Sequence, residues 1–84
     1  MADSPPLAAI QAALSEAAAA HHDYEANFLG GERDEHWPGF YAAFVLGRLG
    51  DFASPTSLTE WIRDSPQDAA DWAASAAEYI VSKR

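Results

Sequence analysis

One stripe of side chains runs through the first third of the chain at alternating spacings of three and four residues. It consists of Leu7, Ile10, Leu14, Ala17, His21, Tyr24 and Phe28. Because residues three and four apart share one face of an α-helix, this spacing predicts a single long helix. Ser4 is the expected N-cap, with two prolines in the first turn. Gly30-Gly31 is expected to end the helix at about residue 29.

A second helix is predicted from Asp34, which suits the start of a helix, to Gly50, which closes it. Pro38 falls within its first turn, where a missing N–H is tolerated. Gly47 is an interior glycine, which is tolerable if another helix approaches closely there. The apolar residues at helical spacing are Trp37, Phe40, Tyr41, Phe44, Val45 and Leu49.

Two further helices are expected after residue 55. The third is short and begins at the capping box Ser57-Leu58-Thr59-Glu60. The fourth begins with Ser65 as N-cap and Pro66 at its first position. Its expected inner stripe is Ala69, Trp72, Ala73, Ala76, Tyr79 and Ile80.

These patterns predict an all-α fold: a compact four-helix domain, mostly antiparallel, with one short helix. The short connections favour antiparallel neighbours. The chain has 84 residues, which suits one helical domain over residues 1–84.

Composition excludes several classes of function. The net charge is −8 and the five basic residues are scattered, so we expect no binding to nucleic acid and none to membranes. The chain has no cysteine, which excludes disulfides and thiolate chemistry. No stretch is apolar enough to span a membrane, and the N-terminus does not look like a signal peptide, so we expect a cytoplasmic protein.

All three histidines lie in two short stretches on either side of the double-glycine turn. On a helical wheel His21 continues the inner stripe, and Glu25 lies one turn further on, between His21 and His22. Folding the second helix back across the turn brings His36 and Tyr41 toward this group. The candidate binding corner consists of His21, His22, Tyr24, Glu25, His36, Trp37 and Tyr41.

The corner has two chemical interpretations. His21, Glu25 and His36 are the residue types of a two-histidine, one-carboxylate metal site. The same side chains suit a buried hydrogen-bond network, with His22 as an exposed cation near the end of the helix. Metal sites in helical bundles usually draw Glu and His from several helices, and here the chain after residue 50 contains no histidine. No cofactor is predicted, and a divalent metal at His21, Glu25 and His36 is the alternative.

Four aromatic residues, Trp37, Phe40, Tyr41 and Phe44, crowd the same end of the molecule. They are interpreted either as core packing or as an aromatic-lined pocket with a few polar anchors. Signatures of common enzymes are missing: the chain has no Gly-x-Ser-x-Gly, and no Gly-Lys-Ser/Thr follows Gly30-Gly31.

The segment from His21 to Phe44 resembles a group of small bacterial proteins of unknown function. The resemblance rests on His22-Asp23-Tyr24-Glu25, on Gly30-Gly31, and on Asp34-Glu35-His36-Trp37-Pro38 followed by an aromatic pair and alanine. It implies no activity, cofactor or partner. It does imply that the corner between the first two helices is the feature that the group shares.

The leading hypothesis is a non-enzymatic module that binds a protein partner or a small ligand through the aromatic and histidine corner. A homodimer is also expected, because a small chain with a heptad-like stripe gains core by association. The alternative is a metal-binding protein, in one version a metal-dependent enzyme. A third hypothesis is a pH-responsive switch at His21.

Overall fold

The computed structural model describes residues 5–83, which form four α-helices. They are α1 (Leu7–Phe28), α2 (Trp37–Leu49), α3 (Pro55–Asp64) and α4 (Trp72–Lys83). No strand occurs among these residues. The predicted all-α, compact four-helix domain with one short helix is therefore confirmed.

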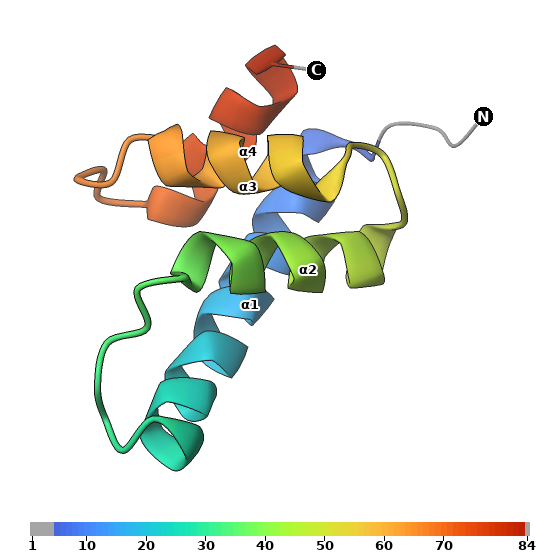
Figure 1. The fold of residues 1–84 in the computed structure, drawn as a ribbon. Coiled ribbons are helices and arrows are strands. Elements are labelled where there is room, and N and C mark those ends of the chain that lie inside the picture. The colour runs from blue at the N-terminus through green and yellow to red at the C-terminus, as the bar shows by residue number, and fades with distance from the viewer. Residues whose placement is uncertain (1–4, 84) are drawn as a thin grey trace.

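The helices pack in a ring in which α1 contacts α2 and α4, and α3 contacts the same two helices. Figure 1 shows α2 and α3 running in opposite directions, with α2 lying across α1. α1 leads away from the end of the molecule at which it begins, and α4 leads back toward that end (Figure 1). Antiparallel neighbours are thus combined with a wide crossing between α1 and α2.

One hydrophobic core joins all four helices. Its largest fully buried side chains are Ile10, Leu14, Val45, Leu58, Ile62 and Ile80. Alanines on three of the helices, Ala13, Ala42, Ala76 and Ala77, are also buried in this cluster. Their small side chains let the helix backbones approach closely, so the alanine-rich composition serves packing as well as helix formation.

The stripe on α1 is buried only over its middle. Ile10, Leu14, Ala17 and His21 are buried, whereas Leu7, Tyr24 and Phe28 are exposed. α1 has 22 residues and α2 has 13, so α1 overhangs the helix that it crosses. Even so, none of the helices in residues 5–83 combines the length and apolarity that crossing a membrane requires.

Three predicted helix starts were wrong. α2 begins at Trp37 rather than Asp34, whose carboxylate bonds to the His21 ring and to the backbone N–H of His36 in the preceding loop. α3 begins after Ser54, whose Oγ accepts from the Ser57 N–H at 3.1 Å, so Ser57 is not the cap. α4 begins only at Trp72. The N-cap predicted at Ser4 lies outside the described residues.

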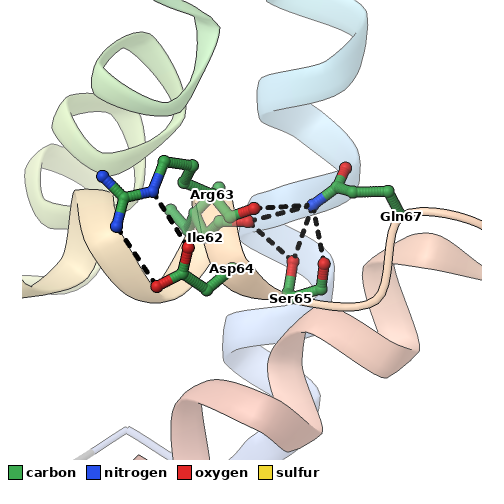
Figure 2. Close-up of polar contacts among 5 residues, drawn as sticks. All are labelled: Ile62, Arg63, Asp64, Ser65 and Gln67. Carbon is green, nitrogen blue, oxygen red and sulfur yellow. Dashed lines mark hydrogen bonds and ion pairs between the residues drawn. The ribbon is translucent and has the colours of Figure 1, made fainter.

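The segment between α3 and α4 explains why Ser65 does not start a helix. Ser65 ends α3, and its Oγ donates back to the Ile62 carbonyl at 2.7 Å. Figure 2 shows the Gln67 amide nitrogen turned toward the end of α3, where it donates to the carbonyl of Ser65 at 2.8 Å. The Asp71 carboxylate then accepts from the Ala74 N–H at 3.2 Å and supports the first turn of α4.

Gly47 does not mark a close approach of helices. It is exposed, and a Cβ built on it would meet nothing within 4 Å. Gly50, in contrast, ends α2 as predicted, with φ at 90°, a backbone angle that favours glycine.

Candidate functional site

The end of α1 and the loop of residues 29–36 form one side of the candidate site. Figure 1 shows α1 extending past α2 and the loop leading back to the start of α2. Gly30 and Gly31 turn the chain with φ values of 63° and 86°. The Gly31 N–H donates to the Glu25 carbonyl at 2.9 Å. The turn thus sends the loop back along α1, toward the side chains that face the fold.

Asp34 fastens this loop to α1 at two points. Its Oδ2 lies 3.0 Å from Nε2 of His21, and its backbone N–H donates to Oε2 of Glu25 at 2.8 Å. Its Oδ1 accepts from the backbone N–H of His36 at 2.9 Å. Asp34 therefore orients the two side chains of α1 that it contacts, His21 and Glu25, and shapes the approach to α2.

His21 is enclosed by the fold and is only 6% exposed. Its ring lies 4.9 Å from the Phe40 ring and 5.3 Å from the Tyr41 ring, centroid to centroid, and both aromatic rings are tilted by 60°. Because a carboxylate only accepts hydrogen bonds, the contact with Asp34 requires a proton on Nε2. The other nitrogen, Nδ1, is 3.8 Å from Oε1 of Glu25, which is too long for a hydrogen bond.

Two pKa shifts follow from this arrangement. The hydrogen bond from His21 lowers the pKa of Asp34 below its ordinary value of 3.8, and the His36 backbone N–H adds to that effect. Burial raises the pKa of Tyr41 above its ordinary value of 10.0, and the negative charge of Glu25 raises it further.

An open pocket of about 320 Å³ lies between α1, the loop, α2 and the start of α4. Its walls combine charged, amide and aromatic side chains. They are His21, Glu25, Arg33, Asp34, Trp37, Tyr41, Gln67 and Trp72. The lining residues come from α1, the loop, α2, the segment between α3 and α4, and the start of α4, so they are as far apart in sequence as 21 and 72.

Three of these residues form a cluster of nearly perpendicular rings. The ring centroids of Trp37 and Tyr41 are 5.4 Å apart, those of Tyr41 and Trp72 are 5.3 Å apart, and those of the two tryptophans are 6.0 Å apart. The angles between the ring planes are 82°, 89° and 73°. Such edge-to-face packing is favourable, and it presents electron-rich ring faces in different directions.

The buried indole N–H of Trp72 lacks a hydrogen-bond partner among the described residues. Buried donors normally have a partner, so this group is an exception. The Tyr41 ring, nearly perpendicular to the indole, offers it at most a weak N–H···π contact.

The structure assembles four of the seven residues that were predicted for the corner. His21, Glu25, Trp37 and Tyr41 all line the pocket. Tyr24 touches the group from outside, since its ring lies 5.4 Å from that of Phe40 and stacks on Phe28.

The two other predicted histidines lie elsewhere. His22 is exposed on the surface of α1. His36 is also exposed and lines a separate hollow with Pro38, Thr59 and Arg63.

Four lining residues were missed from the sequence. Asp34 was interpreted as marking a helix start, although its position nine residues after Glu25, across a glycine turn, suits a return to α1. Arg33 is its neighbour in the loop. Gln67 and Trp72 come from the other end of the chain, and no local pattern connects them with the corner.

The predicted metal ligands do not converge in this arrangement. Among residues 5–83, the structure gathers no set of three His, Asp or Glu side chains suited to one ion. Asp34 and Glu25 approach different nitrogens of His21, and His36 lines the other hollow. The metal hypothesis stays a prediction, and elemental analysis of protein purified without a histidine tag would test it.

Comparisons of the chain with family models, with curated proteins and with solved structures find no match. The resemblance of residues 21–44 to small bacterial proteins therefore stays a prediction.

Proposed function

We propose that the protein is a non-enzymatic domain that binds a small ligand in the pocket between α1, α2 and the start of α4. The observation that carries the proposal is that the fold itself orients the pocket's polar groups. The side chain of Asp34 bonds to the ring of His21, and its backbone N–H bonds to the carboxylate of Glu25. Preorganised polar groups beside aromatic walls are the usual composition of a ligand site.

The shape of the site supports a small ligand over a flat protein partner. The pocket volume of about 320 Å³ is at the small end of the range for ligand pockets, which is roughly 300–1,000 Å³.

The three tryptophans provide a direct test. Trp37 and Trp72 line the pocket, whereas Trp61 lies on α3 outside it and serves as an internal control. We expect a screen of small polar compounds, followed by ¹H–¹⁵N NMR, to find compounds that shift the indole signals of Trp37 and Trp72 in a saturable way. The Trp61 signal should stay in place.

Each indole signal can be assigned with one Trp→Phe variant. If every compound that binds shifts Trp61 as strongly as the other two, or if a broad screen shifts none of the three, the proposed site is wrong.

A further inference from the structure

The pocket contains one carboxylate oxygen that no described residue satisfies. Both oxygens of Asp34 accept hydrogen bonds, and Oε2 of Glu25 accepts from the Asp34 N–H. Oε1 of Glu25 is left 3.8 Å from Nδ1 of His21, beyond hydrogen-bond distance. The Glu25 side chain is 25% exposed, so this oxygen is partly shielded from water and still accessible to a ligand.

The aromatic cluster that lines the same pocket as this oxygen favours positive charge. Trp37 and Trp72 carry indole rings and Tyr41 carries a phenol, and these rings attract cations to their faces. Their nearly perpendicular planes present such faces in more than one direction. Burial raises the pKa of Tyr41, and the charge of Glu25, which lines the same pocket, raises it further.

Among the described residues that line the pocket, Arg33 is the only lysine or arginine, and it leaves the negative charge of the carboxylates unpaired. Arg33 is exposed, and no ion pair in the described part of the chain joins it to Glu25 or Asp34. The protein as a whole has a net charge of −8, which adds long-range attraction for cations.

We infer that the pocket takes an organic ammonium ion, with its charged nitrogen beside Oε1 of Glu25 and its alkyl part against Trp37, Tyr41 and Trp72. This inference rests on the proposed function and specifies the chemistry of the ligand. The ammonium group can belong to a free amine or to a lysine side chain, since both present the same charge and a similar alkyl chain.

The test compares three probes of matched shape. Choline carries the charge, 3,3-dimethylbutan-1-ol is its neutral isostere, and 3,3-dimethylbutanoate carries the opposite charge. Binding is measured from the indole NMR signals of Trp37 and Trp72, with Trp61 as the control. We expect choline to bind about tenfold more tightly than the neutral isostere and the carboxylate to bind least.

Three substitutions sharpen the test by the sign of their effect. Glu25→Gln keeps an acceptor for the Asp34 N–H and removes the charge, so choline should bind about tenfold more weakly. Arg33→Gln removes the repelling cation, so choline should bind more tightly. Glu78 lies on the exposed face of α4. Glu78→Gln changes the net charge by the same amount and sign as Glu25→Gln, and it should leave binding unchanged. Thermal unfolding of each variant checks that it is folded.

A lysine-containing peptide and n-butylammonium separate the two sources of the ligand. Tighter binding of either one supports the inference and identifies the source. Equal binding of choline and its neutral isostere would overturn the inference, as would tightest binding of the carboxylate, while the pocket itself would stand. No binding of any ammonium probe would also overturn it, and the broader compound screen would then decide whether the pocket binds a ligand at all.

Discussion

Asp34 is the residue on which the geometry of the site depends most. It connects the loop to His21 through its side chain and to Glu25 through its backbone. Within the described part of the chain, His21 and Glu25 have no other side-chain hydrogen bond, so replacing the Asp34 side chain would release His21 and leave Glu25 held by the backbone N–H alone. The two shifted pKa values at the site provide separate tests of this geometry.

We expect Asp34→Asn to reduce the acid sensitivity of the fold. The native state holds the pKa of Asp34 below 3.8, chiefly through the His21 hydrogen bond. As the pH falls, the unfolded chain therefore takes up this proton first. The stabilisation is complete above about pH 4 and is lost as the pH falls through the lowered pKa. Urea unfolding from about pH 6 to about pH 3 should thus show a shallower fall in the variant.

Asp23→Asn is the control for this measurement, because Asp23 is exposed on α1. It should keep the acid sensitivity of the wild type. Identical pH profiles for wild type and Asp34→Asn would mean that the His21–Asp34 contact does not form in solution.

The alkaline range tests the contact between Glu25 and Tyr41. Burial raises the pKa of the Tyr41 hydroxyl above 10.0, and the charge of Glu25 adds to the shift. We expect Glu25→Gln to lower this pKa part of the way back, as measured by phenolate absorbance, with Tyr41→Phe identifying the signal. The stabilisation from the neutral phenol is present below about pH 10 and is lost as the pH rises through the raised pKa. An unchanged titration in Glu25→Gln would contradict the placement of that carboxylate.

At the scale of the elements, the existence of the helices followed from sequence and their starts did not. Apolar residues spaced three and four apart identify the buried face of a helix, but they do not identify its first residue. Caps depend on which of several nearby polar side chains reaches the first backbone N–H groups, and tertiary contacts decide that. Asp34 shows the conflict: its Oδ2 bonds to His21 while its Oδ1 accepts from the backbone N–H of His36, and α2 begins three residues later, at Trp37.

The cap of α3 can be tested with a matched pair of serines. Ser54 Oγ accepts from the Ser57 N–H, whereas Ser57 contributes its backbone and not its side chain. We expect Ser54→Ala to lower the free energy of unfolding by about 1 kcal/mol. Ser57→Ala should change it by no more than a few tenths of a kcal/mol, roughly the difference in helix propensity. Denaturant unfolding that shows the larger loss for Ser57→Ala would restore the predicted capping box.

At the scale of the whole molecule, the overhanging end of α1 leaves aromatic surface uncovered. Phe28 is 76% exposed and stacks on Tyr24. These two residues continue the stripe that predicted a homodimer, so they are the ones that an association of two copies would bury. The net charge of −8 opposes that association, because two copies repel each other.

We therefore expect self-association that strengthens with salt. Screening of the charge should raise the dimer fraction in sedimentation equilibrium, and Phe28→Ser should lower it. Leu7→Ser, at the other exposed end of the stripe, is the control and should have little effect. If the protein stays monomeric at high protein concentration and in high salt, the prediction of a homodimer is wrong.

The candidate site was predictable where it is local in sequence. His21 and Glu25 share one turn of α1, and Trp37 and Tyr41 share one turn of α2, so helical periodicity together with one chain reversal was enough. Trp72 and Gln67 join the pocket through the packing of α4 on α1, which no short-range pattern reports. His36 was misplaced because the late start of α2 leaves it on the outer side of the loop.

The most direct test of this site is the state of the three histidine rings in solution, measured by ¹H–¹⁵N NMR. We predict that only His21 shows a slowly exchanging Nε2–H, with nuclear Overhauser contacts to Phe40 and Tyr41, and that Asp34→Asn abolishes that signal. His22 and His36 should exchange freely with water. If the ring N–H protons of all three histidines exchange alike, and His21 shows no contact to either aromatic ring, the buried imidazole that lines the pocket is contradicted.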